Sequence, residues 1–193
     1  MQFIYVIRHG ETDANVKGKV NDKNITTPIN KNGKLQAKKT GKYLQKEFCS
    51  GKSCIIYSSP SIRAVQTSEL IAKELKINLS EIIQDDRINE IDYGIMSGLQ
   101  EGDKIHNAYM KEFNKLPKDP IMLELSFDKF DKLIEKKFKA ESMDKIKKRI
   151  KSFYNSLPKN KKNIIVVTHG GIVNGTIMTL FNINPQVKGD LSN

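Results

Sequence analysis

Three short apolar runs, each rich in β-branched residues, punctuate the chain. They read FIYVI at residues 3–7, CIIYS at 54–58 and NIIVV at 163–167, and small or polar residues follow each of them. A continuous apolar run of this length is typical of a strand that is buried on both faces. We therefore predict that these three segments are strands of one buried sheet.

Between and after these runs, apolar residues recur at helical spacing. Asn30 is suited to cap a helix that reaches about residue 48, and Ser59 as N-cap with Pro60 at the first helical position is suited to begin the next helix. The sequence IVNGTIMTLFNI, from residue 172, predicts a helix after the last strand. The expected inward positions of the first two helices are Ala37, Gly41, Leu44 and Phe48, and Ala64, Ser68, Ile71 and Leu75.

The charged segment from about residue 100 to 157 carries two further amphipathic stripes, which we interpret as helices packed on the core. They consist of Phe127, Phe130, Leu133, Ile134 and Phe138, and of Met143, Ile146, Ile150 and Phe153. Strands that alternate with helices pair in parallel through right-handed crossovers. The predicted fold is α/β, a three-layer sandwich with a mostly parallel central sheet flanked by helices. We expect a single domain over residues 1–193, with a helical elaboration at about 100–157.

The formal net charge is +11, which raises the possibility of nucleic-acid binding. However, only four of the 33 basic residues are arginines, and the lysines are spread along the chain. We therefore expect a solvated basic surface and no nucleic-acid partner. The apolar runs fall far short of the roughly 20 residues that a spanning helix needs, and the start of the chain does not resemble a signal peptide. These features predict a cytoplasmic protein without membrane contact.

The two cysteines, Cys49 and Cys54, lie in the short sequence CSGKSC. The chain has no second cysteine pair and no histidine near this one, so neither a zinc site nor a disulfide scaffold is indicated. We expect both cysteines to be reduced, structural thiols.

Two of the chain's three histidines, His9 and His169, occur in the same local context, directly after a predicted strand and before a glycine. Ligand sites of open parallel sheets form beyond the carboxyl ends of the strands. If the two strands are neighbours, the two imidazoles face one pocket, where glycines such as Gly170 leave backbone amides free to donate. Arg8 and Arg63 fall at the same edge, and such a donor cluster suits a phosphate dianion.

Four blocks of sequence, in order, resemble the histidine phosphatase superfamily, in its phosphoglycerate mutase-like branch. They are IRHGETDAN, YSSPSIRAVQTSELIA, INEIDYGIMSGL and VVTHGG, and the similarity extends over nearly the whole chain. This resemblance implies a phosphoglycerate mutase-like sandwich and phosphoryl transfer without a metal or other cofactor.

The resemblance also implies a role for each matching residue. His9 is expected to attack phosphorus and become a phosphohistidine, while Arg8, Arg63, Asn15 and His169 hold the phosphoryl oxygens. Glu90 is expected to protonate the leaving group and then to activate water. From the residues alone, Glu11 and Asp92 are equally good candidates for this acid.

The expected activity is hydrolysis of a small phosphorylated metabolite, in the manner of a histidine-type acid phosphatase. The main alternative is a 2,3-bisphosphoglycerate-dependent phosphoglycerate mutase, which would use 2,3-bisphosphoglycerate as a primer. Mutases of the family place a lysine where this chain has Glu101, and an arginine pair in the following segment, which contains no arginine here. A non-catalytic phosphate-recognition module is a further alternative, as is a basic nucleic-acid binder. Neither the exact substrate nor the oligomeric state can be deduced from the sequence.

Overall fold

The computed structural model describes residues 2–49, 54–159 and 162–181. Its sheet has the strand order β1-β4-β2-β3, and every adjacent pair is parallel. The strands are β1 (Ile4–Arg8), β2 (Cys54–Ser58), β3 (Ile83–Gln84) and β4 (Asn163–Thr168). The three strands expected from the sequence are confirmed. The short strand β3 was not predicted, because its two residues are exposed and form no apolar run.

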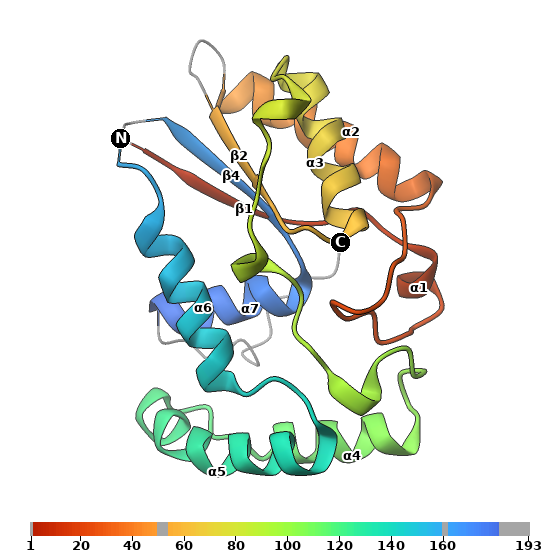
Figure 1. Ribbon diagram of the computed structural model, residues 1–193, viewed down its shortest axis with the longest axis vertical. Helices are drawn as coiled ribbons and strands as arrows, with labels where there is room; N and C mark the ends of the chain where they lie inside the picture. The colour runs from red at the N-terminus through yellow and green to blue at the C-terminus, as the bar shows by residue number, and fades with distance from the viewer. Residues whose placement is uncertain (1, 50–53, 160–161, 182–193) are drawn as a thin grey trace.

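The central strand β4 shows why the sheet is covered on both faces, since all six of its residues are buried. Ile165 and Val167 pack with residues of α2 (Lys31–Glu47) and α3 (Ile62–Leu75). Ile164 and Val166 point to the other face, where they meet Phe153 and Leu157 at the end of α6 (Met143–Ser156). Figure 1 shows the two groups of helices on opposite sides of the strands. The predicted α/β sandwich with a parallel central sheet is confirmed.

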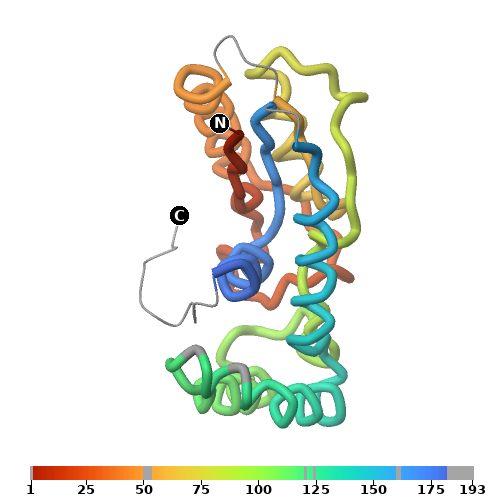
Figure 2. Tube along the Cα trace, turned by 90° about the vertical axis from the view of Figure 1, so that its left-hand side faces the viewer, coloured from red at the N-terminus to blue at the C-terminus, as the bar shows by residue number. Residues whose placement is uncertain are grey.

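A second apolar core lies beyond the sheet, where α6 and α7 (Gly170–Phe181) meet α5 (Pro120–Phe138). The two amphipathic stripes expected in this region fall on α5 and α6, and most of their members are buried. The helices α4 (Lys104–Phe113) and α5 form one end of the molecule (Figure 2). The remaining helices are α1 (Asp13–Val16) and the 3-10 turns η1 (Leu79–Glu81), η2 (Asp86–Ile88) and η3 (Gly94–Met96).

The helix starts test two of the capping predictions. The side chain of Asn30 accepts a hydrogen bond from the Gly33 amide at 2.9 Å, so the predicted cap of α2 is confirmed. The predicted start of α3 is wrong, because its N-cap is Ser61 and Ile62 is its first residue. The Ser59 amide instead donates to Val167 O at 2.9 Å, which keeps residue 59 on the sheet.

The prediction of two reduced thiols is also wrong, because Cys49 and Cys54 form a disulfide. Cys49 follows the end of α2 and Cys54 begins β2, and this connection brings their Cα atoms to 6.2 Å, within the usual range for a disulfide. The bridge lies at the amino end of β2, whereas both histidines follow carboxyl ends of strands. None of the helices in the described ranges is long and apolar enough to cross a membrane.

Candidate active site

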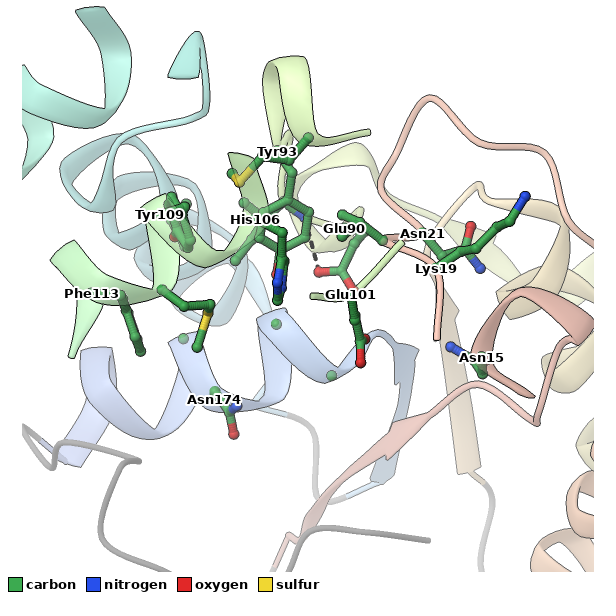
Figure 3. A pocket seen from close by; sticks show the side chains of 18 of the residues that line it. Asn15, Lys19, Asn21, Glu90, Tyr93, Glu101, His106, Tyr109, Phe113 and Asn174 are labelled. Carbon is green, nitrogen blue, oxygen red and sulfur yellow. Dashed lines mark hydrogen bonds between the residues drawn. The ribbon is translucent and has the colours of Figure 1, made fainter. Parts of the chain in front are cut away.

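The two predicted histidines lie side by side at the carboxyl edge of the sheet. Arg8 pairs with Thr168 at the ends of the neighbouring strands β1 and β4, and the His9 amide donates to Thr168 O at 2.8 Å. The ring centroids of His9 and His169 are therefore only 5.2 Å apart, with an interplanar angle of 64°. A cavity of about 370 Å³ opens at this edge (Figure 3).

His9 is held in one tautomer by its own neighbour. Its Nδ1 lies 2.8 Å from Gly10 O, an acceptor, so the neutral ring carries its proton on Nδ1 and keeps a lone pair on Nε2. Burial lowers the pKa of His9 to about 3, with further lowering by Arg63 and Arg8. Gly10 must be a glycine, because a Cβ there would lie 2.5 Å from Gly33 O. The outcome is a neutral imidazole with Nε2 available for attack on an electrophile.

His169 is held in the opposite tautomer by a chain of hydrogen bonds. The Glu90 amide donates to Asn89 Oδ1 at 2.9 Å, which fixes the orientation of that side-chain amide. The Ser59 hydroxyl donates to the same oxygen at 3.1 Å, and Ser59 Oγ lies 2.7 Å from His169 Nε2. Since the hydroxyl proton is already donated to Asn89, Ser59 Oγ accepts a hydrogen bond from the Nε2–H group of His169, and Nδ1 carries the lone pair.

The Nδ1 atom of His169 is fully buried and has no hydrogen-bond partner in the described part of the chain. It lies 4.0 Å from Glu90 Oε2. Burial, followed by the charge of Arg63, lowers the pKa of His169 well below its ordinary value. An orphaned buried atom of this kind is costly unless a ligand or a proton satisfies it.

Glu90 faces the histidines from the loop after η2. Its Oε1 accepts a hydrogen bond from the Ile91 amide at 2.9 Å, drawn as a dashed line in Figure 3, and the carboxyl group also accepts one from the Gly171 amide. Burial nevertheless raises the pKa of Glu90 to about 7. The carboxyl group is therefore protonated in a large fraction of molecules at neutral pH, as a general acid requires.

The loop that carries Glu90 is secured by Arg149 of α6. This guanidinium donates to the carbonyl oxygens of Arg87 and Asn89 at 2.7 and 2.8 Å and pairs with Glu141 at 2.7 Å. Sequence reasoning assigned no role at the site to Arg149 or Asn89, and it assigned Ser59 only the cap of a helix. Hydrophobic periodicity does not reveal these roles, because the contacts of Arg149 with the loop and of Ser59 with His169 join residues 60 or more positions apart.

The two predicted arginines differ in position. Arg8 is exposed and lines the cavity. Arg63 is fully buried, does not line the cavity, and donates to the backbone oxygens of Asn21, Asp22 and Ile25 at 3.0–3.1 Å. Its Nε is buried and has no partner among the described residues. Arg63 therefore ties the loop after α1 to the site, and its Nε remains a free donor.

Asn15 and Gly170 both line the cavity. The amide and the hydroxyl of Thr12 donate to Asn15 Oδ1 at 3.1 and 2.8 Å, and the nitrogen end of the Asn15 amide points into the cavity (Figure 3). Gly170 lies beside Arg8, since a Cβ on it would lie 3.5 Å from the guanidinium Nε. The structure thus brings all seven predicted site residues to one edge, with Arg63 and His169 buried beneath the cavity wall.

The remaining cavity wall was not predicted residue by residue. One side is apolar and comes mainly from the helical segment, and the opposite rim comes from the loop after α1. None of the described histidines, cysteines and carboxylates forms a group of three or more that could hold a metal ion. The wall residues outside the predicted site include Lys19, Asn21, Tyr93, Met96, Glu101, His106, Tyr109, Met110, Phe113, Met143, Asn174 and Met178.

The parallel sheet with two histidines at its carboxyl edge defines the class of protein, and comparison with known proteins identifies its family. Residues 4–191 match the histidine phosphatase superfamily (branch 1), and the chain belongs to this family. This membership confirms the family resemblance, and members of the family are enzymes.

Three relatives illustrate the range of the family. Phosphoserine phosphatase 1 of Hydrogenobacter thermophilus is 27% identical over 168 residues, which cover 86% of this chain and 70% of the relative. The crystal structure of a phosphoglycerate mutase from Bacillus anthracis has a TM-score of 0.71 at 25% identity, covering 92% of this chain and 78% of that one. A phosphoserine phosphatase from Entamoeba histolytica, in complex with 3-phosphoglyceric acid, has a TM-score of 0.67 at 25% identity, covering 96% and 82%.

Proposed function

We propose that this protein hydrolyses phosphomonoesters of small metabolites through a phosphohistidine on His9. The observation that carries the proposal is the state of His9. It is a neutral imidazole whose Nδ1 is bonded to Gly10 O, and its Nε2 is left free at a cavity that Arg8 and Glu90 also line. Membership of the family and its named phosphatases support the same reaction.

In the first step, His9 Nε2 attacks phosphorus in line with the ester oxygen. The N–P bond forms, the P–O bond to the alcohol breaks, and the proton of Glu90 passes to the departing oxygen. Arg8, the free Nε of Arg63 and the Asn15 amide stabilise charge on the phosphoryl oxygens. In the tautomer found here His169 does not donate to these oxygens, because its Nε2 proton is engaged by Ser59 and its Nδ1 carries the lone pair.

In the second step, water attacks the phosphohistidine. The Glu90 carboxylate takes one proton from the water, the O–P bond forms, and the N–P bond breaks to release inorganic phosphate. Glu90 ends protonated and His9 ends neutral, so both groups return to their starting states. The raised pKa of Glu90 suits this exchange, since both of its protonation states are accessible near neutral pH.

The test uses two esters, p-nitrophenyl phosphate and an alkyl phosphate. His9→Ala should abolish hydrolysis of both while leaving the circular dichroism spectrum unchanged, and the wild type should form an acid-labile phosphoenzyme that this variant lacks. Glu90→Gln should slow the alkyl ester by about 10²–10⁴-fold and the aryl ester much less, because only the poor leaving group needs a proton. Hydrolysis of either ester by the His9→Ala variant would refute the assignment of His9 as the nucleophile.

Glu11→Gln and Asp92→Asn are matched controls, since they remove the other two carboxylates that the sequence left open. Loss of alkyl phosphatase activity in either of them, with Glu90→Gln unaffected, would move the acid role to that residue.

The alternatives give different results in the same assays. A phosphoglycerate mutase would interconvert 2- and 3-phosphoglycerate and would need 2,3-bisphosphoglycerate as primer. A phosphate-recognition module would bind inorganic phosphate but hydrolyse no ester. We favour hydrolysis because Glu101, a carboxylate, lines the cavity that a phosphoglycerate would have to enter.

For partners and location, we propose a small phosphorylated substrate, no nucleic acid and a cytoplasmic site of action. A binding assay with generic duplex DNA at low salt tests the second point, since a basic nucleic-acid binder would show steeply salt-dependent affinity. Cell fractionation tests the third.

A further inference from the structure

The half of the cavity that lies away from His9 must receive the alcohol part of the substrate. Glu101 lies here, in the turn after η3, and its backbone is held against the loop after α1. Its amide donates to Gly18 O at 2.6 Å, and the adjacent Gln100 forms an antiparallel bridge with Lys19. These contacts place the side chain over the cavity, and Figure 3 shows its carboxylate directed inward.

Among the residues that the structure describes, the charged groups of the cavity wall are Arg8, Lys19, Glu90 and Glu101. Arg8 lies beside Gly170 at the phosphate end, and Glu90 is the proposed acid. The Lys19 ammonium points away from the cavity in Figure 3. Within the described residues Glu101 takes part in no ion pair, so its charge is not locally neutralised. The alcohol end of the cavity is therefore negative.

Two further polar side chains, those of His106 and Asn174, line this end of the cavity. The Gly102 amide donates to His106 Nδ1 at 3.2 Å, so a neutral His106 ring carries its proton on Nε2. The Asn107 side chain donates to Gly102 O at 2.7 Å and steadies the same turn. Asn174 of α7 lines the wall below His106 (Figure 3). In this arrangement a carboxylate would meet an imidazole N–H and a side-chain amide, and no guanidinium or ammonium group of the described residues is directed into this end. The rest of this wall is apolar and consists largely of Met96, Tyr109, Met110, Phe113 and Met178.

We propose that Glu101 is a specificity-determining residue that excludes leaving groups bearing a carboxylate. The substrates are then phosphomonoesters of neutral or cationic alcohols, whose hydroxyl or ammonium group donates to Glu101. This inference rests on the proposed phosphatase activity. It predicts a preference different from the one that the names of the phosphoserine phosphatase and phosphoglycerate mutase relatives suggest.

The test uses two pairs of substrates that differ only in the carboxylate. O-Phosphoethanolamine is compared with O-phosphoserine, and glycerol 1-phosphate with 3-phosphoglycerate. The wild type should favour the member without the carboxylate by up to roughly fivefold in kcat/KM, as expected for one partly screened like-charge contact. Glu101→Gln should bring the first ratio close to one, because it removes the repulsion of the phosphoserine carboxylate, whereas the ammonium group that Glu101 attracts is common to both esters.

Glu112→Gln is the matched control, since it removes the same charge from α4 outside the cavity wall, and it should leave both ratios unchanged. Raising the salt concentration should narrow the wild-type ratios and leave those of Glu101→Gln unaffected. A wild type that prefers the carboxylated esters, or ratios that Glu101→Gln does not change, would overturn the inference. If p-nitrophenyl phosphate is not hydrolysed either, the proposed function itself fails.

Discussion

Replacing Glu90 with glutamine is expected to stabilise the fold at neutral pH while it impairs catalysis. Glutamine has nearly the same shape, and its Oε1 can accept the Ile91 amide as the carboxylate does at 2.9 Å. Its nitrogen would take the place of Oε2, which lies 4.0 Å from the lone-pair nitrogen of His169. The substitution thus removes a buried ionisable group without leaving a cavity.

The size of the effect follows from the raised pKa of Glu90. Below about pH 4.5 the carboxyl is protonated in both the folded and the unfolded chain, so it adds no pH dependence. Between 4.5 and about 7 only the unfolded chain releases the proton, and the wild type loses about 1.4 kcal/mol of stability per pH unit. Above pH 7 the cost is constant, at about 3 kcal/mol. The glutamine variant does not have this destabilisation, because its side chain does not ionise.

The assay is urea unfolding of both proteins from pH 5 to pH 8. The free energy of unfolding of Glu90→Gln should exceed that of the wild type by about 3 kcal/mol at pH 8, and the difference should shrink towards pH 5. In thermal unfolding this corresponds to roughly 6–12 °C at pH 8. Glu112→Gln should show no such trend, because the ion pair with Lys115 lowers the pKa of the Glu112 carboxyl group and so places its titration below this pH range. A difference that does not vary with pH would refute the reasoning.

Two other contacts yield predictions. Ser59→Ala removes the acceptor of the hydrogen bond from His169 Nε2 and should lower kcat roughly tenfold or more. ¹⁵N NMR of this variant should show a mixture of imidazole tautomers for His169. An unchanged spectrum would contradict the proposed tautomer of His169. Reducing the bridge between Cys49 and Cys54 should cost about 2 kcal/mol, as loop-closure entropy predicts for so short a loop, and should lower the melting temperature without changing kcat. Altered turnover after reduction would show that the bridge is coupled to the site.

Much of the architecture could be predicted from the sequence, because its signals are local. The short apolar runs of β1, β2 and β4 are typical of strands buried in a sheet, and the helices between them favour parallel pairing. Parallel strands end at the same edge, so the positions of His9 and His169 directly after β1 and β4 placed both imidazoles at that edge, and only the structure showed that the two strands are neighbours. The amphipathic patterns that predict α5 and α6 are equally clear in the sequence.

The features that set the chemistry required the tertiary structure. The tautomer of His169 depends on Ser59 and Asn89, the position of Glu90 on Arg149, and the orientation of Arg63 on a loop some 40 residues earlier. These partners are joined by side-chain hydrogen bonds between segments far apart in the sequence, and hydrophobic periodicity carries no information about such bonds. The sequence by itself therefore determined the layers and the edge at which the site forms. Only the folded chain decided which nitrogen is free, which carboxyl stays protonated and what charge faces the substrate.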